Sequence, residues 1–225
     1  MDSGLQLAWT QIITAEDYEA HMAAIGQAQA AAALTREIIQ SAGLSDGGRI
    51  AIVGAGTGQM LDFLDPSLFR PFRITCTDLN PSFLARLKQR LAQHGLTALV
   101  LEDNIEHTAL QPEPDLLLAT LVLEHIDWRL GVQSIAALRP ATCGIIIQQN
   151  PPGMISAVTP SRPLRPSIAK AVEIGHPTLV PQEELLAAFD ALGYTATANW
   201  AQDVADGKRL IALLFRRTCE ANVPS

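Results

Sequence analysis

The segment IAIVGAGTGQML (Ile50–Leu61) decides the fold class of the chain. It opens with a β-branched apolar run, which is typical of a buried strand. Three alternating glycines follow, at Gly54, Gly56 and Gly58. A glycine-rich turn between a strand and a helix lets the backbone approach a ligand closely, although glycines also serve tight chain reversal alone. The segment therefore predicts the first strand and turn of an α/β domain, with a helix beginning near Gln59.

The composition is that of a globular protein with one well-packed α/β domain. Of its 225 residues, 48% are hydrophobic and 17% are charged, and the formal net charge is −7. The 16 Lys and Arg residues are dispersed, so we expect no nucleic-acid partner. The sequence has no signal-peptide pattern and no apolar run of about 20 residues, and we expect a cytoplasmic protein without a membrane partner. Its three cysteines are widely spaced and form no metal-binding pair, so no metal is expected.

Strand and helix patterns alternate along most of the chain. Strand patterns occupy 49–53, 72–77, 98–102, 115–123 and 143–149, and helical patterns occupy 14–43, 81–95, 127–139 and 181–193. This alternation implies right-handed crossovers and a parallel, doubly wound sheet with helices on both faces. Asp206-Gly207 lies between two further strand-like runs and predicts an antiparallel hairpin. We expect a three-layer Rossmann-like α/β fold with a mostly parallel seven-stranded sheet.

The spacing of the three glycines narrows the choice of ligand. The dinucleotide fingerprint G-x-G-x-x-G would need a glycine at position 59, which is Gln59. The sequence G-A-G-T-G instead resembles motif I of the class I S-adenosylmethionine-dependent methyltransferases, and the resemblance extends over residues 49–217. It implies S-adenosylmethionine as the cofactor and S-adenosylhomocysteine as the product. It further implies transfer of the methyl group to a nucleophilic atom of a small-molecule acceptor by in-line displacement.

The resemblance also assigns cofactor contacts to particular residues. They are Gly54, Ala55, Gly56, Thr57, Gly58 and Gln59; Asp78, Leu79 and Asn80; Asp103, Asn104 and Ile105; Ala119, Thr120 and Leu121; and Tyr18 of the N-terminal helix. Asp78 would bind the ribose hydroxyls, because a carboxylate can accept two hydrogen bonds at once. Asp103 would accept from the adenine amine. The alternatives are a helix cap at Asp78 and a solvated loop acid at Asp103.

Ile52 departs from the family pattern, which usually has an acidic residue two positions before the first glycine. Loss of a hydrogen bond to a charged group would weaken cofactor binding by about 1.5–3 kcal/mol. Family members often use an N-terminal helix as a lid over the cofactor. We therefore expect Tyr18, Gln27 or Gln29 to replace the missing acid.

Polar residues that follow the fourth and fifth strands form the candidate catalytic site, because sites in open α/β sheets lie beyond the carboxyl ends of the strands. His125 is the first candidate for a general base, since an ordinary histidine pKa near 6.5 suits this role, and Glu124 is the second. A capping or packing histidine is the alternative reading. The candidate acceptor-binding residues are His21, Met22, Gln149, Asn150, Arg162, Arg165 and His176. The arginines could bind a carboxylate or phosphate, or be ordinary solvated charges.

The sequence predicts an N-terminal helical lid (1–47), a Rossmann-like domain (48–217) with a proline-rich flap (150–180), and a tail (218–225). Exposed parts of the lid helix could pair with a second copy of the chain in a homodimer. Two other functions stay open. One is a methyltransferase-fold binding module without catalytic activity. The other is an NAD(P)-dependent oxidoreductase, which Gln59, the terminal hairpin and the lack of a Tyr-x-x-x-Lys pair disfavour.

Overall fold

The computed structural model describes residues 3–154, 163–175 and 177–218, and its centre is a seven-stranded sheet of order β3-β2-β1-β4-β5-β7-β6. Five strands are parallel: β1 (Arg49–Val53), β2 (Arg73–Asp78), β3 (Ala98–Glu102), β4 (Leu116–Thr120) and β5 (Thr142–Gln149). β7 (Arg209–Arg217) pairs antiparallel with both β5 and β6 (Tyr194–Asp203). The predicted α/β fold class and terminal hairpin are confirmed.

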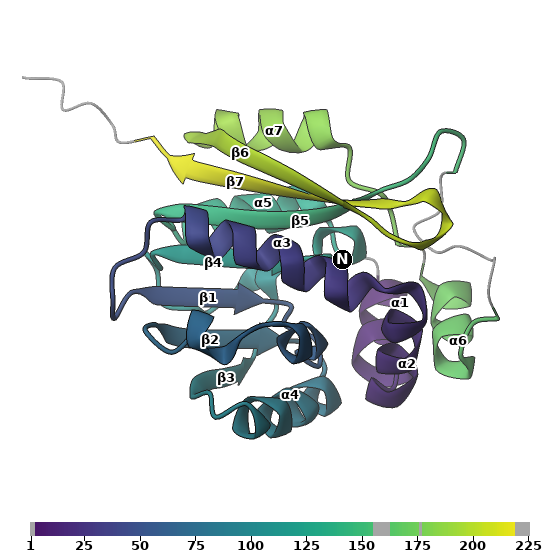
Figure 1. Cartoon of the computed structure of the whole chain (residues 1–225). Coiled ribbons are helices and arrows are strands. Elements are labelled where there is room, and N and C mark those ends of the chain that lie inside the picture. The colour runs from purple at the N-terminus through teal and green to yellow at the C-terminus, as the bar shows by residue number, and fades with distance from the viewer. Residues whose placement is uncertain (1–2, 155–162, 176, 219–225) are drawn as a thin grey trace, which may run out of the picture.

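Helices cover both faces of this sheet (Figure 1). α3 (Gln27–Ser41) and α4 (Pro81–Gln93) pack on one face, and α5 (Trp128–Ala137) and α7 (Gln182–Ala191) pack on the other. α1 (Ser3–Leu7), α2 (Ala15–Ile25) and α6 (Pro166–Ile174) gather beyond the end at which the parallel strands terminate (Figure 1). Helices α1, α2 and α6 therefore cover the edge of the sheet where α/β proteins bind ligands.

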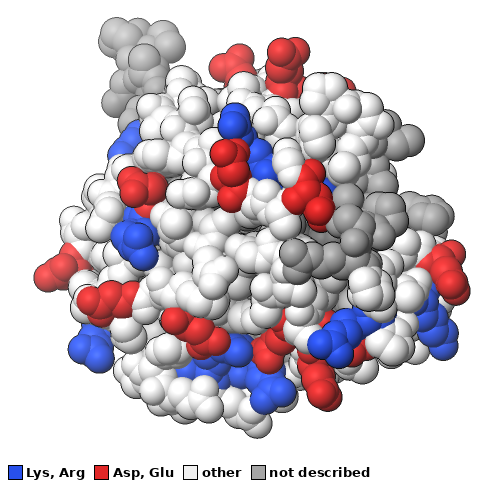
Figure 2. Space-filling view, turned by 45° about the vertical axis from the view of Figure 1, so that its right-hand side comes forward, with Lys and Arg blue, Asp and Glu red and all other residues white. Residues whose placement is uncertain are grey.

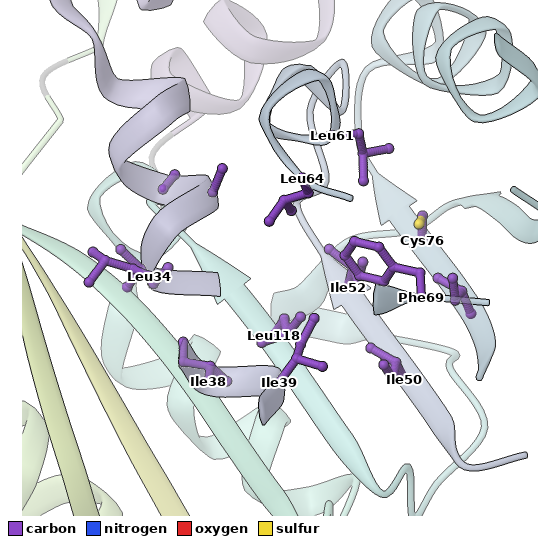
Figure 3. Close-up of a cluster of buried hydrophobic side chains, with 14 of the residues drawn as sticks. Leu34, Ile38, Ile39, Ile50, Ile52, Leu61, Leu64, Phe69, Cys76 and Leu118 are labelled. Atoms are coloured by element: carbon purple, nitrogen blue, oxygen red, sulfur yellow. The ribbon is translucent and has the colours of Figure 1, made fainter. Parts of the chain in front are cut away.

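Alternation along β1 divides the core into two layers. Ile50 and Ile52 lie in one cluster with α3 residues such as Leu34, and Phe69 packs near Ile52 (Figure 3). Ala51 and Val53 face the opposite cluster, under α5 and α7. Ile52 is only 5% exposed, so a carboxylate at this position would be buried among apolar side chains. This packing accounts for an apolar residue at position 52.

The N-terminal helical pattern is divided into two helices. The Thr14 side chain accepts a hydrogen bond from the backbone nitrogen of Asp17 and caps α2. Gly26 has a φ of 70° and separates α2 from α3. The predicted helical pattern begins at Thr14, whereas in the structure the leader before it (residues 3–13) contains α1 and a π-helix (Ala8–Ile12). The leader is ordered because its apolar side chains pack against α6, which periodicity cannot reveal.

The helix predicted from Gln59 was wrong. A 3-10 helix (Gln59–Phe63) and a second 3-10 helix (Pro66–Leu68) occupy this connection instead. Asp65 is extended, as residues before proline usually are, and its side chain caps the second turn. Proline thus interrupts the chain before an α-helix can form.

The other connections carry two further features. The β6–β7 hairpin turns through Ala205–Gly207, where Asp206 has a φ of 64°. The segment predicted as a flap contains α6, while its residues 155–162 and 176, like the tail residues 219–225, lie outside the described part of the chain. In the ranges that the structure describes, no helix is both long and apolar enough to cross a membrane.

Candidate cofactor and acceptor site

A large pocket lies beyond the carboxyl ends of β1, β2, β4 and β5. The N-terminal helices and α6 line its outer side. Strand-end residues from the glycine turn to His125 line its floor. Segments that are distant in sequence therefore share one cavity, with the sheet on one side and a helical cover on the other.

The three glycines of the turn serve different purposes, although all three have positive φ. A Cβ on Gly54 would lie 2.3 Å from a side-chain carbon of Val122, and one on Gly58 would lie 2.4 Å from Leu87. A Cβ on Gly56 would come no closer than 3.5 Å to any atom, the nearest being the hydroxyl of Tyr18. The outer glycines thus allow close packing within the protein, and the central one leaves room at the pocket wall.

Asp78 ends β2 at the pocket and is engaged with the turn. Its Oδ2 accepts from the backbone nitrogen of Gly56 at 2.8 Å, and its Oδ1 accepts from Asn80 at 2.9 Å. Burial raises the pKa of Asp78, and these backbone N–H groups act in the opposite direction. A carboxylate offers about four lone-pair sites, so Asp78 keeps capacity for a ligand diol.

The segment after β3 brings Asp103, Asn104 and Ile105 to the same pocket. Asp103 accepts from the hydroxyl of Thr108 at 2.7 Å and from the backbone nitrogen of Ala109 at 2.9 Å. Asn104 caps the short helix that follows. Asp103 therefore stabilises its own loop while lying at the pocket wall. Both a contact with adenine and a role within the loop are compatible with this position.

The segment after β4 combines a left-handed backbone residue with two buried ionisable side chains on the pocket floor. Leu121 has a φ of 54°, a left-handed conformation that is strained for leucine. Glu124 is buried, and its Oε1 accepts from the backbone nitrogen of Gln148 at 2.6 Å. Burial raises the pKa of Glu124 to about 7, against the effect of this bond, and lowers the pKa of His125 to about 4.

Aromatic side chains line the cover of the pocket. The ring of Trp9 lies with its centroid 4.4 Å from that of His125, and Tyr18 stacks at a tilt on Phe83 with centroids 4.9 Å apart. Burial raises the pKa of Tyr18, with Asp78 adding to the effect. The hydroxyl of Tyr18 therefore stays protonated and can donate a hydrogen bond within the pocket.

Buried polar contacts hold the cover on the domain. The Asn80 amide donates to the backbone oxygens of Trp9 at 2.7 Å and Ile13 at 3.2 Å, while its Oδ1 caps α4. Arg90 donates to Glu19 of α2 at 2.8 Å and to the backbone oxygen of Thr57 at 2.5 Å. The cover is therefore tied to the residues that border the glycine turn.

The pocket brings together many of the residues predicted from the sequence. These are Tyr18, His21, Met22, Gly54, Gly56, Asp78, Leu79, Asp103, Asn104, Ile105, Thr120, Leu121, Glu124 and His125. Ala55, Thr57, Gly58, Gln59, Asn80, Ala119, Gln149, Asn150 and Arg165 are not among its lining residues. Arg162 and His176 lie outside the described residues.

Several of the residues outside the lining have clear structural positions. Gln149 is exposed, because strand alternation turns its neighbour Gln148 inward. Arg165 is also exposed, at the start of α6. Asn150 accepts from Gln148 at 2.8 Å and donates to the backbone oxygen of Met154.

Sequence reasoning missed several lining residues, namely Trp9, Ile13, Phe83, Gln148, Ile168, Asp206 and Lys208. Lys208 is 5% exposed, and burial lowers its pKa. The apolar residues of the leader were the sequence signal that could have identified Trp9 and Ile13 as lining residues. Asp206 was recognised only as a turn residue. In the described part of the chain, no three His, Cys, Asp or Glu side chains gather as a metal site requires.

Comparisons with known proteins agree with this geometry. Residues 52–140 match the family model of the methyltransferase domain. Over this segment, less than half of the chain, the sequence is similar to a methyltransferase domain. The sheet order confirms the predicted fold class, and the match agrees with the predicted methyltransferase family, enzyme class and cofactor. No match was found among curated protein sequences.

Solved structures of methyltransferases share the fold of this domain at low sequence identity. Magnesium protoporphyrin IX methyltransferase from Synechocystis PCC 6803 is 11% identical, with a TM-score of 0.59 over 83% of this chain and 84% of that one. A protein assigned as a sarcosine dimethylglycine methyltransferase from Galdieria sulphuraria is 15% identical, with a TM-score of 0.62 over 82% and 84%. An S-adenosylmethionine-dependent methyltransferase from Clostridium acetobutylicum ATCC 824 is 11% identical, with a TM-score of 0.59 over 84% and 91%.

Proposed function

We propose that the chain transfers the methyl group of S-adenosylmethionine to a nucleophilic atom of a small-molecule acceptor by in-line displacement. The observation that carries this proposal is one continuous pocket that joins the glycine turn and Asp78 to Glu124 and His125. Cofactor-type and acceptor-type side chains thus line the same cavity. Alignment of two reactants in such a cavity can contribute several kcal/mol, on the order of 7–11 in the best cases.

The pocket residues fit the cofactor chemically. Asp78 would accept from the ribose hydroxyls, Leu79 and Ile105 would offer apolar surface to the adenine, and Asp103 would accept from its amine. S-adenosylmethionine supplies a sulfonium methyl group that is already activated for attack. The chain itself therefore needs to bind, orient and exclude water, and to accept a proton where the acceptor must lose one.

Tyr18 is the best placed of the three candidates to replace the acid absent at Ile52. Tyr18 and Gln27 line the pocket, whereas Gln29 is exposed. Gln27 already donates to the side chain of Gln148 at 2.8 Å. Tyr18 lies over Gly56, where the amino-acid end of the cofactor would lie. We assign the replacement to Tyr18, with Gln27 beside it.

The order of the two candidate bases changes once their surroundings are known. His125 was the first candidate from the sequence, but burial holds its pKa at about 4, so its neutral ring is a weak base. The pKa of Glu124, at about 7, is better matched to proton transfer near neutral pH. We place Glu124 first as the proton acceptor, with His125 beside it.

Two observations support a small-molecule acceptor. The pocket is covered by α2, α6 and the N-terminal segment, which limits the size of what can enter. The face in Figure 2 carries scattered acidic and basic side chains among uncharged ones, without a broad basic area for a polyanion. Two structural neighbours are also named for small substrates, a porphyrin and the amino acids sarcosine and dimethylglycine.

Calorimetric titration of the purified protein with S-adenosylmethionine tests the proposal, with NADH as the control ligand. Mass spectrometry first checks for copurified S-adenosylhomocysteine. We expect micromolar binding of S-adenosylmethionine and none of NADH. A folded, ligand-free protein that binds no S-adenosylmethionine would refute the proposal. Ile52 favours one alternative function, a binding module without catalytic activity. Transfer of a labelled methyl group to a panel of acceptors distinguishes an active methyltransferase from such a module.

A further inference from the structure

Three buried polar atoms on the pocket floor have no hydrogen-bond partner among the described residues. They are Oγ1 of Thr120, Oε2 of Glu124 and Nδ1 of His125. All three residues line the pocket and lie within six positions of the chain. Buried polar atoms in folded proteins are nearly always paired, so such a group marks a place where a ligand supplies the partners.

Glu124 determines what kind of ligand group suits this place. Its side chain is 2% exposed, and only Oε1 is paired, with the backbone nitrogen of Gln148. A buried carboxylate oxygen that accepts no hydrogen bond, such as Oε2 of Glu124, loses much of its hydration energy. A ligand that donates a hydrogen bond to Oε2, and carries positive charge, would compensate this loss most fully.

The surroundings of Glu124 also favour a cation. The ring of Trp9 contacts that of His125 and meets Tyr18 and Phe83 edge to face at centroid distances of 6.0 and 6.2 Å. Aromatic faces attract ammonium groups, and more strongly where water is excluded. Of the described lining residues, the carboxylates of Asp78, Asp103, Glu124 and Asp206 outnumber the single ammonium, that of Lys208. The net charge of the wall is therefore negative.

We propose that the methyl acceptor is an amine with an apolar body, whose nitrogen binds at Glu124 and His125 beneath Trp9. This inference rests on the proposed methyltransferase function. The apolar body would lie against cover residues such as Ile13, Met22, Ile25 and Val172, which line the same pocket. Thr120 would complete the polar site as an acceptor for a second N–H.

The group transfer balances with these residues. An amine that enters as an ammonium ion gives one proton to the Glu124 carboxylate. The nitrogen lone pair then forms the new N–C bond, while the C–S bond breaks and its electron pair stays on sulfur. The positive charge passes from sulfur to the methylated nitrogen, and the proton on Glu124 leaves to solvent with the product. A pKa of about 7 lets Glu124 accept and release that proton near neutral pH.

Binding of three matched probes to the protein saturated with S-adenosylhomocysteine tests the inference. Phenethylamine, phenethyl alcohol and hydrocinnamate share an apolar body and differ in their polar group. We expect phenethylamine to bind at least about tenfold more tightly than either of the others. Equal binding, preference for the alcohol or the carboxylate, or no binding of the amine would overturn the inference.

Glu124→Gln should weaken phenethylamine binding at least about tenfold and leave phenethyl alcohol within about twofold. Glu106→Gln is the matched control, because Glu106 is equally buried but does not line the pocket, and it should change neither. Trp9→Leu gives an independent check that leaves the buried carboxylate intact, and it should weaken the amine more than the alcohol.

The same samples separate the two proposals. A protein that binds S-adenosylmethionine and S-adenosylhomocysteine but does not prefer the amine keeps the proposed function and loses the amine inference. A protein that binds neither cofactor form loses the proposed function itself. Selective loss of amine binding in Glu124→Gln, with cofactor binding unchanged, supports both.

Discussion

Asp78 accepts a hydrogen bond from the backbone nitrogen of Gly56, with its Oδ2 2.8 Å from that nitrogen. The residue that ends β2 therefore fixes the conformation of the glycine turn after β1. Its other oxygen holds the backbone of Asn80, where α4 begins. The candidate ribose ligand, the turn and the start of α4 thus form one connected unit.

This arrangement predicts that Asp78→Ala weakens binding of S-adenosylmethionine by about 10- to 100-fold, because both a charged acceptor and the support of the turn are lost. Asp78→Asn keeps one carbonyl oxygen and should lose less. Calorimetric titration measures both. Asp65→Ala, which removes an acidic cap remote from the pocket, is the control and should bind normally. Wild-type affinity in Asp78→Ala would mean that Asp78 only supports the turn.

Gly58 gives a prediction about stability rather than binding. An alanine there must adopt a φ of 70° and places its Cβ 2.4 Å from Leu87. The left-handed backbone costs roughly 1–2 kcal/mol, and overpacking adds roughly 1–3 kcal/mol. Gly95→Ala is the matched control, because Gly95 also has positive φ but nothing within 4 Å. In urea denaturation Gly58→Ala should be clearly the less stable. Equal losses would show that Leu87 moves aside without cost.

The mostly parallel seven-stranded sheet and the terminal hairpin could be predicted from the sequence, because the strands and the Asp206-Gly207 turn are visible as local patterns. The cover could not, since Trp9 packs with α6 residues more than 150 positions away. The predicted acceptor-binding residue at the end of β5 was also wrong by one position, because Gln148 lines the pocket and Gln149 is exposed. The sequence also could not show that Glu124 is the better candidate base than His125. The burial that shifts both pKa values comes from segments distant in the sequence.

Asn80 should matter more for the cover than for the cofactor. Asn80→Ala removes the cap of α4 and both bonds to the backbone of the N-terminal segment, so we expect a loss of about 2–3 kcal/mol. Asp127→Ala removes only the cap of α5 and should cost about 1 kcal/mol. Hydrogen exchange should accelerate in residues 3–13 of the first variant only. Unchanged exchange there would show that apolar packing alone holds the segment.

A variant of Tyr18 tests whether this residue replaces the acidic residue that is absent at Ile52. Tyr18→Phe removes one hydroxyl from the wall above Gly56 and keeps the ring contacts with Trp9 and Phe83. We expect S-adenosylmethionine to bind roughly 3- to 10-fold more weakly. Gln29→Ala, at an exposed position of α3, should have no effect. If both variants bind like the wild type, Gln27 becomes the remaining candidate.

Glu124 and His125 predict opposite pH dependences of stability. The folded-state pKa of Glu124 is raised from 4.5 to about 7, so its contribution is fully present below pH 4.5 and is lost as the pH rises through 7. The folded-state pKa of His125 is lowered from 6.5 to about 4, so its contribution is present above pH 6.5 and is lost as the pH falls through 4. The two slopes should nearly cancel in the wild type.

Single variants should therefore expose each slope. Relative to the wild type, Glu124→Gln should make the free energy of unfolding rise with pH between about 4.5 and 7, and His125→Asn should make it fall between about 4 and 6.5. Each change has an upper bound of about 3 kcal/mol. Urea denaturation across this range measures both, and difference curves against the wild type remove the contribution of all other titrating groups. Parallel curves for the three proteins would show that both side chains titrate normally and that neither is buried as described.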